Sequence, residues 1–591
     1  MKDFFKMVFA TIVGMLLFFI VIGIFSVMCI MGIVASGSSV KSVDSNSVMV
    51  LNLSGNLEER SEVNFMAKLQ GQSESMGVDE LLSAIKKAQS NEDIKGIYIE
   101  AGMFSYDSYA SLQAIRRALV EFKKSGKWII AYGDSYSQGT YYLASVADKV
   151  YINPEGMVDW HGIGANPMFF KDVMAKFGVK MQLSKVGAYK SAPEMFTADH
   201  MSDANREQVT AYINGIWENL LKDVSASRKI SIDSLNVYAD NLTTFDDTKT
   251  LIAKKLVDGV LYTDEVKDVV KKQLNIDSKD DINQLGLLDM ASVKSTGDDG
   301  EQIAVYYAVG DIVDTNPSSI TSQGPVINAQ VVCKDLEKLA DNDDVKAVVL
   351  RVNSGGGSAY ASEQIWHQVE MLKKKKPVVV SMGGMAASGG YYISAGSNWI
   401  VAEPTTLTGS IGIFGMFPDM SGLLKDKLGV RFDEVKTNKN SNFGTIARPF
   451  NEEEMSYLNT YIDRGYKLFR KRVADGRKLS VEDVEKVAQG RVWLGQDALK
   501  IKLVDQLGGL DAAVAKAAKL AKLDQYYTSD YPDMPDLFEQ IMSQADNATG
   551  SYLDKAMQEA LGELYAPVSL LRDINHQNAI QARVPFVLNL R

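Results

Sequence analysis

The chain has 591 residues, and 63 Lys and Arg against 74 Asp and Glu give it a formal net charge of −11. Its length favours more than one domain, and its acidic balance excludes a general nucleic-acid binder, which needs basic surface to neutralise phosphates. The two cysteines exclude a disulfide framework and a zinc site built from cysteine alone. The four histidines lie far apart, so we expect any hydrolytic reaction to use a base other than histidine.

An apolar segment near the N-terminus, residues 7–34, contains no charged residue. About 20 apolar residues are enough to span a bilayer. The segment is longer than the apolar part of a cleavable signal peptide, so a retained anchor is favoured over cleavage near residues 34–37. Lys2 and Lys6 precede it and place the N-terminus in the cytoplasm. We therefore expect the chain from about residue 45 onward to lie outside the cytoplasm.

The chain contains an internal repeat with an offset of about 250 residues. Three pairs of segments show it: GTYY at 139–142 with GGYY at 389–392, GI at 162–163 with GI at 412–413, and LVDG at 256–259 with LVDQ at 503–506. These matches indicate duplication of a whole domain rather than a short solenoid repeat.

Each half alternates short apolar runs with amphipathic segments. In the second half a strand is predicted at 347–352, a helix at 362–373 and a strand at 377–381. The first half has the same order, at 97–100, 109–123 and 128–131. This alternation predicts right-handed βαβ units and a mostly parallel sheet in each half, an α/β fold.

The predicted organisation has four parts. They are a cytoplasmic tip, transmembrane anchor and linker (1–45), a first repeat (46–290), a second repeat (301–525) and a helical tail (526–591). Residues 278–300, rich in Lys, Asp, Ser and Gly, are interpreted as the linker between the repeats. Helical segments are expected in the tail near 537–545 and 552–564.

Two Gly-rich turns, at 353–358 and 383–390, each follow a predicted strand of the second half. Neither has the lysine of a P-loop or the spacing of a dinucleotide fingerprint. They are either tight turns of a parallel sheet or loops that direct backbone amides at an oxyanion. Ser388 lies in the second turn between small residues, at the start of a helix-like run. That arrangement is typical of a nucleophile elbow.

A serine nucleophile needs a positioned base. His367 lies in an amphipathic helix, where a surface or packing role is favoured, and His161, in a loop of the first half, is a weaker candidate still. Lys190 fits better. The first-half position equivalent to Ser388 is Gln138, so the first half lacks the nucleophile.

The second half, in turn, has Asn440 or Ser441 at the position equivalent to Lys190. Each half therefore holds one member of a Ser/Lys pair, although Lys439 remains an alternative base. A lysine base must be neutral, and burial lowers its pKa from about 10.4 to roughly 7–8.

Several segments together resemble one family, from the anchor to about Leu523. They are YKSA at 189–192 with Glu194 and Phe196, RVNS at 351–354 with GGS at 356–358, AASGGY at 386–391, LTGSIG at 407–412, and QGRVW at 489–493 with GQDA at 495–498. The chain resembles the long, two-repeat form of the bacterial signal peptide peptidases, the protease IV family. One departure is Gly355, where the family usually has proline.

The resemblance implies tandem crotonase-like domains, a fold shared with the Clp protease, behind one transmembrane helix. It implies that Ser388 is the nucleophile, Lys190 the general base and Ser410 a hydroxyl that orients the lysine. The backbone amides of Gly357 and Gly389 correspond to the oxyanion-hole donors. No metal and no cofactor are implied.

The resemblance also implies a membrane-anchored serine endopeptidase that hydrolyses remnant signal peptides and other hydrophobic peptides through an acyl-enzyme. The expected location is the bacterial inner membrane, with the catalytic domains on the periplasmic side. The expected partners are membrane lipid, through residues 7–34, and three further copies of the chain in a homotetramer, with no nucleic acid. An acyl-CoA enzyme of the crotonase type and an inactive peptide-binding scaffold remain as alternatives. Sequence leaves open whether the pair forms within one chain or between subunits.

Overall fold

The computed structural model describes residues 42–60, 75–294, 300–315, 325–533 and 580–583, with scattered positions between 4 and 22. The predicted anchor at 7–34 lies largely outside these residues. Within the described part of the chain, no helix has both the length and the apolar character needed to cross a membrane.

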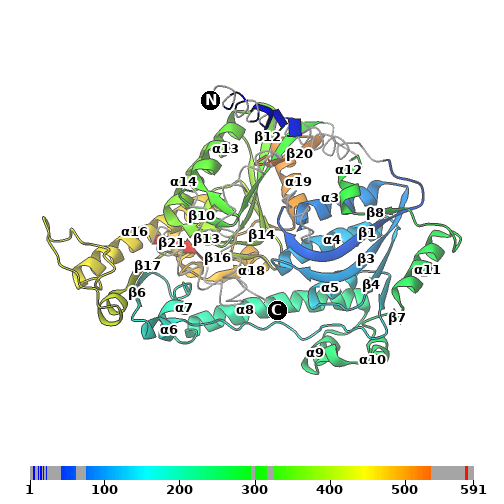
Figure 1. Cartoon of the computed structure of the whole chain (residues 1–591), viewed down its shortest axis with the longest axis horizontal. Coiled ribbons are helices and arrows are strands. Elements are labelled where there is room, and N and C mark those ends of the chain that lie inside the picture. The colour runs from blue at the N-terminus through cyan, green and yellow to red at the C-terminus, as the bar shows by residue number, and fades with distance from the viewer. Residues whose placement is uncertain are drawn as a thin grey trace.

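The first repeat is built on a seven-stranded sheet in the order β2-β1-β3-β4-β5-β7, with β8 beside β1 (Figure 1). All of its pairings are parallel. The strands are β1 (Ser47–Glu58), β2 (Met76–Gly77), β3 (Ile94–Ser105), β4 (Trp128–Gly133), β5 (Lys149–Ile152), β7 (Gly259–Val260) and β8 (Gln284–Leu285). Its helices include α3 (Val78–Ser90), α4 (Tyr109–Lys124), α5 (Gln138–Ala144) and α8 (Asp203–Arg228).

The second repeat has an eight-stranded sheet in the order β18-β16-β14-β12-β9-β20, with β15 joining β14 to β19. Every pairing is parallel except that of β16 with β18. The strands are β9 (Glu301–Val309), β12 (Val345–Ser354), β14 (Val378–Ala387), β15 (Trp399–Ala402), β16 (Leu407–Gly409), β18 (Val492–Leu494), β19 (Gln506–Leu507) and β20 (Tyr526–Tyr531). Its helices include α13 (Ala329–Asp341), α14 (Ala359–Lys375), α15 (Gly389–Ser394), α16 (Glu452–Arg477) and α19 (Leu510–Ala521). The predicted α/β fold with mostly parallel sheets is confirmed.

Matching contacts in the two halves reflect the duplication. Helices α8 and α16 each have 26 residues and each end at a left-handed lysine, Lys229 and Lys478. The hydroxyl of Tyr141 donates to the Leu256 carbonyl at 2.8 Å, and the hydroxyl of Tyr391 donates to the Leu503 carbonyl at 2.9 Å.

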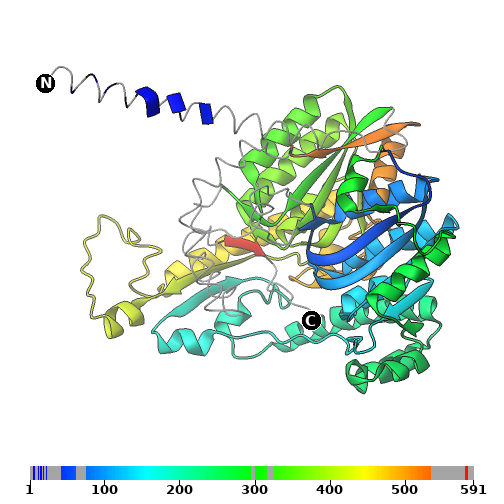
Figure 2. The ribbon, with the colours of Figure 1, turned by 45° about the vertical axis from the view of Figure 1, so that its right-hand side comes forward.

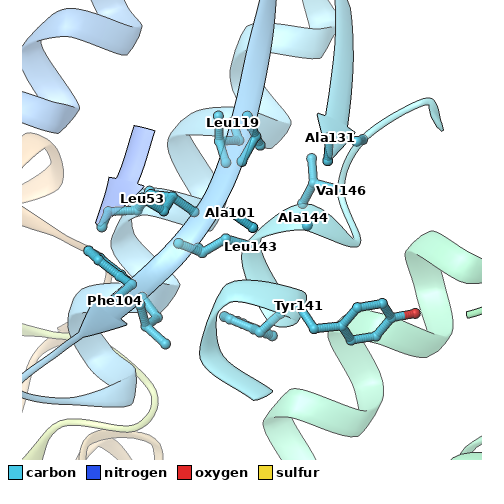
Figure 3. Close-up of a cluster of buried hydrophobic side chains, with 14 of the residues drawn as sticks. Leu53, Ala101, Phe104, Leu119, Ala131, Tyr141, Leu143, Ala144 and Val146 are labelled. Carbon is cyan, nitrogen blue, oxygen red and sulfur yellow. The ribbon is translucent and has the colours of Figure 1, made fainter. Parts of the chain in front are cut away.

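The core of the first repeat is continuous with part of the second. Figure 3 shows residues of this core from β1, β3, β4, α4 and α5, Leu119 and Tyr141 among them. The same cluster of buried residues includes four from the second repeat: Ala387, Leu407, Val492 and Leu494. The two repeats therefore bury apolar surface against each other, which favours one fixed arrangement.

A third sheet, in the order β11-β10-β13-β21-β17-β6, joins segments that are far apart in the sequence (Figure 2). Its strands are β6 (Lys180–Lys185), β10 (Asp311–Val313), β11 (Val326–Asn328), β13 (Gly356–Ser358), β17 (Phe414–Asp419) and β21 (Ile580–Arg583). Strand β6 comes from the first repeat and pairs antiparallel with β17 of the second. This sheet lies where the repeats meet.

Two sequence-based expectations are corrected. The linker predicted at 278–300 contains β8 and the helix α12 (Leu287–Ser292), because Leu285 and Met290 are apolar and fill the first core. The tail assigned to residues 526–591 begins with β20, which pairs parallel with β9 and so extends the sheet of the second repeat to residue 531. Residues 580–583 also form a strand, and the helices expected at 537–545 and 552–564 lie outside the described residues.

Candidate active site

Ser388 lies at the sharp turn between β14 and α15. Its backbone has φ 55° and ψ −113°, a conformation that non-glycine residues rarely adopt. The turn is fixed by a hydrogen bond from the Ser388 amide to the Gly409 carbonyl at 2.8 Å. A Cβ at Gly390 would lie 2.6 Å from the Ser354 carbonyl oxygen, so the turn needs a glycine there. This is the strained, closely packed elbow that the small neighbours of Ser388 predict.

Lys190 lies in the loop after β6 and reaches the same point from the first repeat. Its Nζ is 2.7 Å from Ser388 Oγ, 3.1 Å from Ser410 Oγ and 3.3 Å from the Ser410 carbonyl oxygen. The structure thus brings the three side chains together within one chain, although 198 positions separate the lysine from Ser388.

The Lys190 side chain has no exposed surface. Burial disfavours the charged ammonium and lowers the pKa of Lys190 well below its usual value of 10.5. A lysine held neutral in this way has a lone pair that can accept the proton of a hydroxyl 2.7 Å away.

Two glycines of the second repeat make room for the lysine. A Cβ on Gly490 would lie 2.6 Å from both the amide nitrogen and the Cβ of Lys190, and one on Gly412 would lie 3.2 Å from its Cδ. The Tyr189 amide donates to the Gln489 carbonyl at 3.0 Å and ties the two loops together. Both glycines stand in motifs quoted for the family resemblance, but the sequence assigned them no role.

Gln208 of α8 is a buried link that the sequence did not predict. Its Nε2 donates to the Tyr189 carbonyl at 3.1 Å and to Ser191 Oγ at 2.8 Å. Its Oε1 accepts from the Val492 amide at 3.1 Å, so it joins the lysine loop to β18. Glu194, four residues after Lys190, accepts hydrogen bonds from Ser202 and Asn205. These bonds hold the C-terminal end of the loop that carries Lys190.

Gly357 and Gly389, the expected oxyanion-hole residues, lie on either side of Gly356. A Cβ on Gly356 would lie 2.7 Å from the Gly389 amide nitrogen, and this glycine has φ +103°. A Cβ on Gly357 would lie 2.1 Å from the Ile312 carbonyl oxygen. Glycine at both positions therefore lets neighbouring backbone pack closely against this turn. Gly355 differs, because its φ is not positive and an added Cβ would meet only Met385 Sδ, at 3.3 Å.

In the first repeat, the side chain of Gln138 fills the position equivalent to that of Ser388. Gln138 Oε1 accepts from the His161 and Gly162 amides at 3.3 and 3.1 Å, and its Nε2 donates to the Tyr109 hydroxyl at 2.9 Å. Glutamine therefore occupies the position that the serine holds in the second repeat, as the sequence comparison of the halves indicated.

The alternative bases lie elsewhere. Lys439 is exposed and pairs with Glu453. His367 is exposed on α14, as expected of a helix-surface residue, and His161 pairs with Asp159 at 2.7 Å. Of these candidates, only Lys190 contacts Ser388.

Comparison with known proteins identifies the family of the chain. The sequence profile of peptidase family S49 matches residues 121–277 and 370–524, and that of the Clp protease matches residues 305–401. The chain is 39% identical over 490 residues to "Protease 4" of Salmonella typhi, covering 82% of this chain and 78% of that protein. It is 35% identical over 515 residues to "Protease 4" of Haemophilus influenzae, covering 83% and 82%.

A plant relative is "Serine protease SPPA, chloroplastic" of Arabidopsis thaliana. It is 30% identical over 487 residues, which cover 81% of this chain and 70% of that protein. The S49 profile matches once in each half, so the S49 domain is present twice, and the Clp protease profile matches within the second half. The chain belongs to peptidase family S49 and is a serine-type peptidase that acts on peptide bonds.

Proposed function

We propose that the chain is a membrane-anchored serine endopeptidase in which Ser388 is the nucleophile and Lys190 the general base. The observation that carries the proposal is the 2.7 Å contact between a fully buried lysine Nζ and the hydroxyl of a serine in a strained elbow. Both features are those required to activate a serine without a histidine.

The reaction begins when Lys190 takes the proton of Ser388 and Oγ attacks the substrate carbonyl carbon. The Gly357 and Gly389 amides stabilise the negative oxygen of the tetrahedral intermediate. The intermediate collapses as the C–N bond breaks and Lys190 returns the proton to the leaving amine. Water then attacks the acyl-enzyme by the same route, which releases the acid and restores both residues.

Ser410 orients the lysine in this proposal. It contacts Nζ through both its hydroxyl and its carbonyl oxygen, at 3.1 and 3.3 Å. Two oxygen acceptors beside Nζ direct the remaining lone pair of a neutral amine at Ser388. Loss of the Ser410 hydroxyl should therefore lower kcat less than loss of either Ser388 or Lys190.

The proposed substrates are remnant signal peptides and other hydrophobic peptides at the bacterial inner membrane. The uncharged residues 7–34 support an anchor, and the lysines before them support catalytic domains on the periplasmic side. The proposed assembly is a homotetramer, which analytical ultracentrifugation of the detergent-solubilised chain would test.

The test compares the wild type with Ser388→Ala and Lys190→Ala on a fluorogenic hydrophobic peptide. Each change should lower kcat by about a thousandfold or more, because the pair acts as a unit. Ser410→Ala should lower it by roughly 10- to 100-fold. Lys439→Ala is the matched control and should leave kcat unchanged, because that lysine is exposed and paired with Glu453.

A fluorophosphonate probe gives an independent readout. It should label Ser388 of the wild type and not the Ser388→Ala variant. Undiminished cleavage by both pair variants, or labelling of another serine, would overturn the proposal.

A further inference from the structure

Strands β12 and β14 are neighbours in the sheet of the second repeat, and their pairing is interrupted just before the active-site turns. Val352 pairs with Met382 and Ser354 with Ala386, so a single residue of β12 lies opposite residues 383–385 of β14. This is a β-bulge, a feature that often directs a side chain next to an active site. The bulge comes shortly before the nucleophile turn on β14 and before the Gly-rich turn on β12.

Asn353 is the residue opposite the bulge, and its side chain replaces the missing backbone pairing. Its Oδ1 accepts a hydrogen bond from the Met385 amide at 3.1 Å. Its backbone carbonyl accepts from the Gly310 amide, which follows β9, at 3.0 Å. A backbone amide inside a sheet that lacks its ladder partner needs another acceptor. Asn353 therefore fixes β14 against β12 at the point where the regular ladder fails.

The amide nitrogen of Asn353 is held by the first repeat. Nδ2 donates to Glu59 Oε2 at 3.1 Å and to Asp107 Oδ2 at 2.9 Å. Glu59 is buried, and its other oxygen, Oε1, accepts from Arg351 Nε at 2.6 Å. Arg351 and Asn353 are two positions apart on β12 and so point to the same face of the sheet. Carboxylates of the first repeat thus hold both polar side chains at this end of the strand.

Two glycines in the bulge let the first repeat approach this closely. A Cβ on Gly383 would lie 2.8 Å from Glu59 Oε2 and 3.0 Å from Asn353 Cβ. A Cβ on Gly384 would overlap Ser108 Oγ. Glycine inside a strand is typical of a bulge against which another segment packs closely. The shape of the bulge therefore depends on contacts with the first repeat.

We propose that Asn353 is a positioning residue for the oxyanion hole, held in place by Glu59 and Asp107 of the first repeat. This inference depends on the proposed function of the Ser388 site. One oxyanion-hole amide follows Asn353 along the chain and the other follows the bulge, so the bulge sets the distance between them. Three consecutive glycines at 355–357 have wide backbone freedom, so their turn needs such an anchor. The first repeat then supports the oxyanion hole as well as supplying the lysine.

Loss of this anchor should affect the transition state more than the bound substrate. Backbone donors stabilise an oxyanion only when they are aimed at the position that it will occupy. The negative oxygen is absent from the bound substrate, so displaced donors should lower kcat and kcat/KM together. They should also weaken the binding of a tetrahedral analogue of the intermediate.

The test compares the wild type with Asn353→Ala and Asn353→Asp, as full chains in detergent. The fluorogenic hydrophobic peptide gives kcat and KM, and a peptide boronate of the same sequence, which forms a tetrahedral adduct with serine, gives Ki. Both variants should lower kcat and raise Ki by at least about tenfold, with KM within about threefold of the wild type. The alanine variant adds no charge, so it decides the question if the aspartate variant fails to fold.

A second change, in the other repeat, should rescue Asn353→Asp. Asp107→Asn alone should lower kcat less than Asn353→Asp does, because an amide oxygen at position 107 can still accept from Asn353. In the double variant, the new amide at position 107 can donate to the new carboxylate at position 353. That variant should have a kcat at least about threefold above that of Asn353→Asp. A loss caused only by poorer packing at position 353 would not be reversed in this way.

Asn219→Ala is the matched control, because Asn219 is another half-buried asparagine that donates across the repeats, to Gln496 Oε1 at 3.1 Å. It should keep the wild-type kcat and Ki, and an equal loss there would overturn the inference. Wild-type kinetics in Asn353→Ala, a lower kcat without a higher Ki, or no rescue by Asp107→Asn would also overturn it. Ser388→Ala, measured alongside, separates the two proposals: its inactivity leaves the proposed function standing in each of these cases, and its full activity would overturn both.

Discussion

Lys190 is completely buried, although lysine is normally a charged surface residue. Its Nζ lies within hydrogen-bonding distance of oxygens of Ser388 and Ser410. Desolvation is the cause of its lowered pKa, because taking the ammonium out of water disfavours the charged form. The same burial that lets the lysine act as a base therefore opposes folding at pH values where a free lysine is protonated.

The pH dependence of activity should follow the neutral form of Lys190. As pH rises through the lowered pKa of the lysine, kcat/KM should increase, and it should level off well below pH 10.5. A profile measured from about pH 5 to about pH 10 tests this. A rate that falls over the range in which the lysine loses its proton would contradict the assignment.

The lowered pKa of Lys190 should also make the difference in stability between the wild type and Lys190→Met depend on pH. Between the folded and unfolded pKa values, the unfolded lysine binds a proton that the folded one does not. The wild type should therefore lose stability relative to Lys190→Met as pH falls from 10.5 toward the folded pKa, and the difference should be constant below it. Urea unfolding at a series of pH values measures this, and a pH-independent difference would contradict it.

The loop that carries Lys190 and the turn before β18 form one structural element of the site, although they come from different repeats. Gly490 has φ +79° and lies against the backbone of Lys190. Gln208 links the same two segments by hydrogen bonds. The position of the lysine is thus set by backbone packing and by a buried amide.

Gly490→Ala should displace Lys190 and lower kcat by at least about tenfold, because misplacement of a catalytic group by about 1 Å is costly. Gly429→Ala is the matched control, since Gly429 has φ +72° but nothing within 4 Å of an added Cβ. The free energy of unfolding of both variants should fall by roughly 1–2 kcal/mol, because alanine is disfavoured in the left-handed conformation. Kinetics on the hydrophobic peptide, with thermal unfolding alongside, checks this. Equal activity in the two variants would contradict the role of Gly490.

At the scale of the whole molecule, duplication divides the site between the repeats. The first repeat supplies the lysine and has a glutamine in place of the nucleophile, while the second supplies the serine and the glycine turns. Such a site works only if the repeats keep a fixed relation. Two ion pairs cross between them: the buried pair of Arg351 with Glu59 at 2.6 Å, and the pair of the partly exposed Arg117 with the buried Glu403 at 2.6 Å.

Arg351→Met should destabilise the chain by about 3–5 kcal/mol, because it leaves the Glu59 carboxylate buried without its ion partner. The double variant Arg351→Met/Glu59→Gln should recover part of that loss, as neither charge remains. Lys471→Met serves as an exposed-pair control with Asp475 and should have little effect. Urea unfolding measures all three. A double variant that recovers none of the stability lost by Arg351→Met would contradict the coupling of the pair.

The sequence by itself determined the local and repeated features of this protein. Apolar runs and amphipathic periods depend on neighbouring residues, so they predicted the strand–helix alternation, the duplication and the elbow around Ser388. Comparing the halves also suggested Lys190, but local pattern could not separate it from Lys439. Only the tertiary structure decided that Lys190 reaches Ser388 while Lys439 stays in solvent. Gln208, the Arg351–Glu59 pair and the strand at 580–583 were likewise decided there, because each depends on contacts between segments far apart in the chain that no local periodicity records.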